Sequence, residues 1–180
     1  EIKNMSTAYE SLAEQILPQL RRSKLIVDVN LIGLSDEEIL AAIKSDPSVL
    51  SLEQMLYAAT LTNDPAEMLK YYQLATEKEP KCFRAWNNVG WAYLQMGKAD
   101  EAIVALEKAK ALKNDDNVKN NLGFAALLKG DIKGAAEYFN SMSAATPESK
   151  FGLGTIAIHE GKYDQAVNML GDKPTMNLAL

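Results

Sequence analysis

The stretch "WNNVGWAYLQMGKADEAIVALEKA", residues 86–109, decides the fold because it recurs twice further along the chain. The second copy is "KNNLGFAALLKGDIKGAAEYFN" (119–140) and the third is "FGLGTIAIHEGKYDQAVNML" (151–170). In each copy a glycine is followed seven residues later by a second glycine and five residues after that by an alanine: Gly90, Gly97, Ala102; Gly123, Gly130, Ala135; Gly154, Gly161, Ala166. A unit that recurs at such regular intervals, at 86–109, 119–140 and 151–170, is typical of stacked supersecondary units that share one core.

The glycine spacing predicts a helical hairpin in each copy. The first glycine and the alanine are small, so two helices can approach closely at these positions. The middle glycine falls where the first helix ends, and a positive φ there costs glycine little. The second helix then opens with acidic residues such as Asp100 and Glu101, which complement the helix dipole.

With these residues in place, the chain resembles the tetratricopeptide repeat family, whose unit of about 34 residues carries Trp, Leu-Gly, Tyr, Gly, Ala and Pro at fixed positions. The matching residues of the first clear copy are Trp86, Val89, Gly90, Tyr93, Gly97, Ala102, Leu106 and Ala109. The resemblance implies an all-α, superhelical array of helical hairpins that acts as a protein-interaction scaffold. It covers residues 49–172 as about four hairpins, namely 49–82 (a degenerate unit), 83–115, 116–147 and 148–172.

The ends of the chain differ from the array. Residues 1–48 predict a helix–strand–helix segment, with a helix over 6–20, a strand over 24–32, and a helix that begins at Ser35 with Glu38 completing a capping box. Residues 173–180 read as the start of a capping or continuing helix, because Pro174 suits a first helical position. A strand without a partner predicts self-association through 24–32, packing on the array with an open edge, or poor order.

The N-terminal segment is also similar to the closing part of OmpA-like domains in envelope proteins of Bacteroides-type bacteria. That resemblance implies a location in the cell envelope or periplasm, with the cytoplasm as the alternative. Because the chain starts at Glu1, we expect a processed product or an excised piece of a longer protein.

Composition narrows the function classes. The net charge is −5, from 19 basic and 24 acidic residues mixed along the chain, so we expect no nucleic-acid partner. No apolar run approaches the length of a membrane span, so we expect no membrane insertion by this segment.

Three features invite a catalytic or cofactor interpretation, and each has a simpler one. His159 is the single histidine and favours the end of a helix, while Cys82 has no second thiol at metal-binding or redox spacing. "GLGTIA" (152–157) has the form of a dinucleotide fingerprint, but it lies inside a repeat that explains both glycines. We therefore expect no cofactor, no metal site and no catalytic residues, with an enzyme as a remote alternative.

The resemblance places the first helices of successive repeats around a concave groove. Asparagine amides there can hydrogen-bond a peptide main chain, and aromatic rings can pack its side chains. The candidate groove residues are Arg84, Asn88, Trp91, Asn117, Asn121 and Phe124. The alternative is that the asparagines are common in the repeat and the aromatic residues belong to the core between repeats.

Some family members clamp the C-terminal carboxylate of heat-shock chaperones with lysines or arginines of this face. Here the matching positions hold Glu53, Asn88, Asn117 and Asn121, and Arg84 alone is basic. Since an anion needs charge-assisted partners, we expect an acidic peptide of the EEVD type not to bind. The leading prediction is a scaffold that binds a protein or peptide, and the alternative is a structural spacer of a larger OmpA-like protein.

Overall fold

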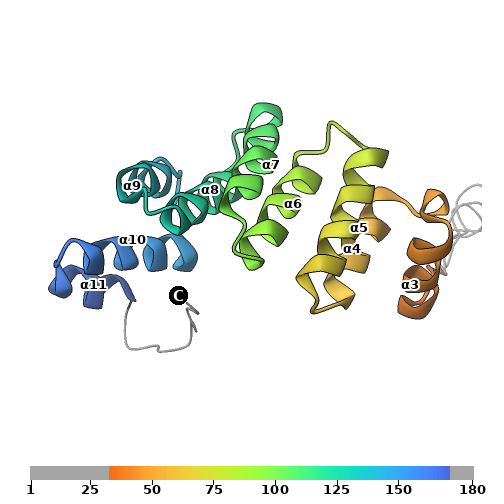
Figure 1. The fold of residues 1–180 in the computed structure, drawn as a ribbon, viewed down its shortest axis with the longest axis horizontal. Helices are drawn as coiled ribbons and strands as arrows, with labels where there is room; N and C mark the ends of the chain where they lie inside the picture. Colours follow the sequence, from red (N-terminus) through yellow and green to blue (C-terminus); the bar gives the residue numbers. More distant parts are fainter. Residues whose placement is uncertain (1–32, 171–180) are drawn as a thin grey trace, which may run out of the picture. The chain divides into compact units, whose positions relative to one another are not determined.

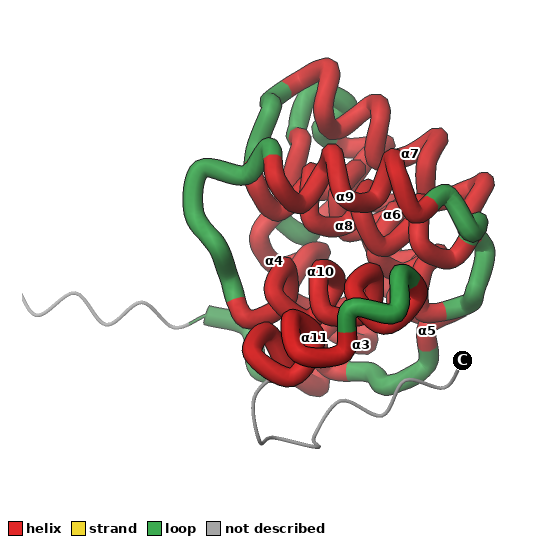
Figure 2. The backbone as a smooth tube through the Cα atoms, turned by 90° about the vertical axis from the view of Figure 1, so that its left-hand side faces the viewer, coloured by secondary structure: helices red, strands yellow, loops and turns green. Residues whose placement is uncertain are grey.

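The computed structural model describes residues 33–170, and every regular element in this range is helical (Figures 1 and 2). The predicted helix over 6–20, the strand over 24–32 and the helix after Pro174 lie outside the described residues. The elements, with the labels of Figure 1, are α3 (Asp36–Ser45), η3 (Pro47–Val49), α4 (Leu52–Ala58), η4 (Ala59–Leu61), α5 (Pro65–Lys78), α6 (Phe83–Gln95), α7 (Ala99–Leu112), α8 (Asp116–Leu128), α9 (Ile132–Asn140), α10 (Pro147–His159) and α11 (Tyr163–Leu170).

Consecutive helices pack in pairs, and the glycine spacing predicts the last three of these pairs. The pairs are α4 with α5, α6 with α7, α8 with α9, and α10 with α11. Gly97, Gly130 and Gly161 follow the first helices of the last three pairs and have φ values of 70°, 76° and 72°. Each hairpin turn therefore depends on a residue that tolerates positive φ.

The small residues lie where helices approach closely. Gly90 of α6 faces Leu106 of α7, and Gly123 of α8 faces Phe139 of α9. Ala102 and Ala135, on the second helices of these pairs, are fully buried.

The first hairpin differs from the others. Its first helix ends in the 3-10 turn η4, and α5 restarts at Pro65 with Asp64 as its N-cap. No non-glycine residue of the described part has positive φ, so Asn63 does not replace the hairpin glycine. The 3-10 turn η4 and a proline start take its place.

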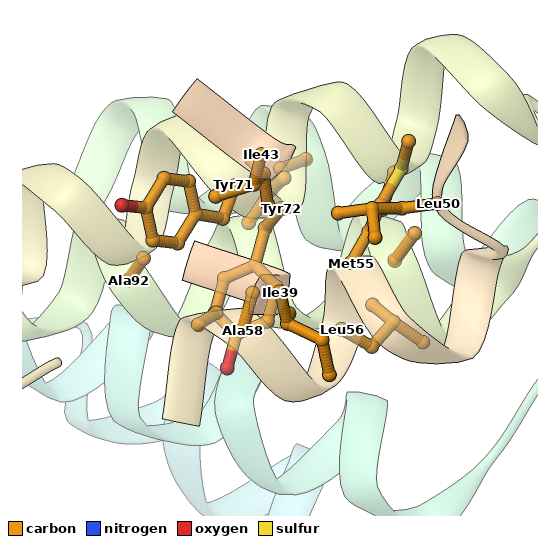
Figure 3. Packing of buried hydrophobic residues seen from close by; sticks show 14 residues of the cluster. Ile39, Ile43, Leu50, Met55, Leu56, Ala58, Tyr71, Tyr72 and Ala92 are labelled. Carbon is orange, nitrogen blue, oxygen red and sulfur yellow. The ribbon is translucent and has the colours of Figure 1, made fainter. Parts of the chain in front are cut away.

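Helix α3 packs on the array. Ile39 and Ile43 are buried in one cluster with Ala58, Tyr71 and Tyr72 of the first hairpin (Figure 3). The capping box predicted at Ser35 is confirmed, with Glu38 and Ser35 bonding reciprocally. From the sequence, this helix is assigned to the N-terminal segment 1–48. In the structure it packs with the first hairpin, and the compact unit that contains the array begins at Leu34.

The candidate peptide-binding groove

Helices α4, α6 and α8 line an open groove of about 710 Å³. They are the first helices of three successive hairpins, so the groove lies on the face where the resemblance placed it. Helix α6 contributes side chains one turn apart, because Arg84, Asn87, Asn88 and Trp91 recur at three- and four-residue spacing. The lining residues are Glu53, Leu56, Tyr57, Thr60, Tyr72, Phe83, Arg84, Asn87, Asn88, Trp91, Asn117, Asn120 and Asn121.

Most of the predicted candidates lie together in this groove. Arg84, Asn88, Trp91, Asn117 and Asn121 all line it. Phe124 does not, because its ring packs edge-on against Phe139, with centroids 5.2 Å apart at 74°, and also near Phe151. For Phe124, therefore, the alternative interpretation as core between repeats describes its position.

The charged residues that line the groove neutralise one another. Both guanidinium nitrogens of Arg84 donate to the two carboxylate oxygens of Glu53, with the Nη1–Oε2 distance at 3.1 Å. The hydrogen bonds from Arg84 hold the pKa of Glu53 below its usual value. The bidentate pair links α4 to α6 and leaves the groove without net charge.

The groove asparagines differ in whether their side chains already make hydrogen bonds within the protein. Asn121 Nδ2 donates to Asn87 Oδ1 at 3.0 Å and so joins α8 to α6, while Asn117 Nδ2 donates to Asp115 at 3.0 Å. Asn120 Oδ1 is buried and has no hydrogen-bond partner. Within residues 33–170, the side chain of Asn88 likewise makes no hydrogen bond, so two lining amides are free to bind something else.

Aromatic side chains border these amides. Trp91 is half-buried and packs on the core of the first two hairpins. Tyr57 is 45% exposed, and its hydroxyl donates to Asp36 at 3.1 Å, which raises the pKa of Tyr57. Sequence reasoning missed three lining residues, namely Tyr57, Thr60 and Asn120. The first two belong to the degenerate first repeat, which gave no clear register. Asn120 lies one position before Asn121, the residue predicted to face the groove.

The other residues considered for chemistry lie apart from this groove. His159 occupies the exposed last turn of α10, and Cys82 is a half-buried free thiol before α6. "GLGTIA" lies inside α10, where Gly152 contacts Phe139 and Gly154 contacts Leu170. These glycines therefore serve packing between helices.

In 33–170 no three His, Cys, Asp or Glu side chains lie close enough together to hold a metal ion. No helix in that range is long and apolar enough to cross a membrane.

Residues 83–116 match the family model described as tetratricopeptide repeat. The chain is also 30% identical over 103 residues to Protein POLLENLESS 3-LIKE 2 of Arabidopsis thaliana. That match covers 57% of this chain and 23% of the relative, so the chain spans less than a quarter of the relative's length.

Several solved structures have the same arrangement of helices. MamA superposes with a TM-score of 0.60 at 20% identity, covering 75% of this chain and 82% of MamA. A tetratricopeptide repeat protein from Parabacteroides merdae gives 0.60 at 15% identity, covering 74% and 56%. YrrB, described as a TPR protein with an unusual peptide-binding site, gives 0.56 at 21% identity, covering 75% and 72%. At these identities the likeness establishes the fold alone, so the described helices have an all-α, TPR-like superhelical repeat fold.

Proposed function

We propose that this tetratricopeptide repeat array is a non-enzymatic interaction module that binds an extended segment of a partner protein in the groove of α4, α6 and α8. The observation that carries the proposal is the pair of free amides, Asn88 and Asn120, in a groove without net charge. A buried acceptor without a partner costs about 1–3 kcal/mol, and a ligand donor relieves this cost once the amide of Asn120 turns toward the groove.

A peptide main chain fits this chemistry. Each peptide unit presents one N–H donor and one C=O acceptor, and an asparagine amide complements both. The rings of Trp91 and Tyr57 beside the amides offer apolar surface for the ligand's side chains. The peptide site described for YrrB, which has the same fold, supports this use of the array.

The proposal is tested with a peptide selected from a random library on the full chain. We expect Asn88→Ala and Asn120→Ala each to weaken its binding about 3- to 10-fold, the range for one neutral hydrogen bond. Asn140→Ala is the matched control, because Asn140 is exposed on α9 and does not line the groove. The thermal midpoint shows whether each variant remains folded. Unchanged affinity in both groove variants would show that the peptide binds elsewhere.

The Arg84–Glu53 pair sets the charge that the groove accepts. Because Glu53 already occupies the guanidinium, an acidic ligand would have to displace a bonded carboxylate before it gained a partner. We expect a peptide with an EEVD-type acidic tail to give no calorimetric signal above dilution. Tight binding of that peptide would contradict the neutral-groove assignment.

The cell-envelope location stays a prediction from the N-terminal sequence. Fractionation of cells that produce the full-length protein tests it. Recovery in the envelope fraction would support a spacer role beside peptide binding, and recovery in the cytoplasm alone would remove that role.

A further inference from the structure

The two flanks of the groove differ in chemistry. Figure 1 shows α6 between the hairpin of α4 and α5 on one flank and α8 on the other. The hairpin flank presents the side chains of Leu56, Tyr57 and Tyr72. The lining residues of α8 are all asparagines, namely Asn117, Asn120 and Asn121. One flank therefore offers apolar surface to a ligand, and the other offers amides.

The two polar lining residues of the hairpin flank are already paired. Glu53 accepts hydrogen bonds from Arg84. The hydroxyl of Thr60 donates to the backbone oxygen of Tyr57 at 2.7 Å. A charged side chain of a ligand would have to compete with these bonds on this flank, whereas an apolar side chain would not.

Trp91 of α6 belongs to the apolar flank. Its side chain packs on the cluster that contains Leu56 and Tyr72. Phe83, at the start of α6, packs instead on the cluster of the next hairpin, and Lys113 Nζ lies 4.5 Å from its ring centroid. The aromatic surface that remains for a ligand is therefore mainly that of Trp91 and Tyr57.

Both of these rings are held in place by the protein itself. Packing on the core leaves Trp91 half-buried, and the hydroxyl of Tyr57 donates to Asp36 of α3 at 3.1 Å. Leu56, which is 9% exposed, lines the same flank. Because the rings are already ordered, a ligand that packs on them pays little for fixing their positions.

We propose that the segment bound in this groove carries an aromatic residue whose ring packs on Tyr57 and Trp91, while the asparagines of α8 bind the main chain beside it. The proposal rests on the proposed function and adds a sequence preference to it. Aromatic rings gain from edge-on or offset packing on one another, beyond the area they bury. The amides contact main-chain groups that nearly all residues share, so the preference is confined to one position of the ligand.

Peptides selected from a random library on the full chain test this preference. We expect the selected peptides to share an aromatic residue at one position and to vary elsewhere. Replacing that residue with alanine should weaken binding at least about tenfold, as for a central aromatic anchor.

A double-mutant cycle places the aromatic ring of the peptide. Tyr57→Ala should weaken binding of the selected peptide, but it should affect the alanine-substituted peptide at least about threefold less. Tyr57→Phe keeps the ring and should keep the coupling. Tyr163→Ala is the matched control and should leave binding unchanged, because Tyr163 is 66% exposed on α11 and does not line the groove.

The possible outcomes separate this preference from the proposed function. Additive losses in the cycle, or selected peptides that share an aliphatic or charged residue instead, would overturn the aromatic preference. If Asn88→Ala and Asn120→Ala still weakened binding in that case, peptide binding in the groove would stand. Selected peptides that bind equally well to both asparagine variants and to Tyr57→Ala would contradict both proposals.

Discussion

Gly90 holds α6 and α7 close together by lacking a side chain. A Cβ atom at Gly90 would lie 2.6 Å from Cδ2 of Leu106, and one at Gly123 would lie 2.6 Å from Cε1 of Phe139. Leu106 is fully buried and has no room to move away. The repeated glycine is therefore a packing requirement, and its partner on the second helix is a large side chain.

We expect Gly90→Ala to destabilise the array by about 1–3 kcal/mol, the usual cost of overpacking a core. The gain in helix propensity, about 1 kcal/mol, offsets part of this cost. Urea unfolding measures the change. In a Leu106→Ala background the added methyl has space, so the same substitution should cost clearly less, and equal costs in both backgrounds would contradict the contact.

Asp116 fastens the connector before α10 to the start of α8. Its carboxylate accepts from the Ser143 side chain, from the Ser143 backbone N–H at 2.8 Å, and from Lys119 Nζ at 2.9 Å. The hydrogen bonds from Ser143 and Lys119 lower the pKa of Asp116 to about 2.

This pKa gives a prediction for acid stability. Because the folded-state pKa lies below the unfolded value of about 3.9, ionised Asp116 stabilises the fold above about pH 4, and this contribution is lost as the pH falls toward 2. The thermal midpoints of the wild type and of Asp116→Asn should therefore converge between pH 4 and pH 2. Ser143→Ala should fall between the two proteins at neutral pH, and a constant gap across this range would contradict the assignment.

At the level of elements, α3 packs on the first hairpin. Its apolar face carries Ile39 and Ile43 into the core, and its first turn holds the acidic residues Asp36, Glu37 and Glu38. The Ser35 capping box fixes where the helix begins. Loss of this cap should loosen the cover over the first hairpin.

Ser35→Ala should lower the free energy of unfolding by about 0.5–2 kcal/mol, the range for losing an N-cap side chain. Ser45→Ala is the control, since its hydroxyl bonds only Ala41 O at the other end of the same helix and is exposed. Chemical denaturation of both variants makes the comparison. Equal effects would show that α3 does not depend on its capping box.

Much at this scale follows from local sequence rules. The three hairpin glycines and the Ser35 cap have direct sequence signals, and the structure confirms their conformations. The end of α4 has no such signal, because Asn63 stands where a glycine is expected and the chain turns through η4 instead. Packing of α3 on the first hairpin depends on contacts between distant residues, which periodicity does not give.

At the scale of the whole molecule, the groove is a product of stacking. Repeat register predicts that Asn88 and Asn121 face the same side, because equivalent positions on successive first helices share one surface. It does not predict that the side chain of Asn121 hydrogen-bonds that of Asn87. Nor does it predict the hydrogen bonds from Arg84 to Glu53, which join two adjacent hairpins. These cross-repeat bonds decide which amides remain free for a ligand. The position of Phe124 is likewise not predicted by repeat register, because its ring packs in the core through contacts with Phe139 and Phe151.

The proposed ligand of the free groove amides is a peptide main chain. The most direct test is the NMR spectrum of the side-chain amide groups of the full chain, recorded while a library-selected peptide is added. We expect the side-chain amide signals of Asn88 and Asn120 to shift, while that of Asn140 on α9 stays in place. Shifts confined to Asn140 and other residues outside the groove, with Asn88 and Asn120 unchanged, would contradict it.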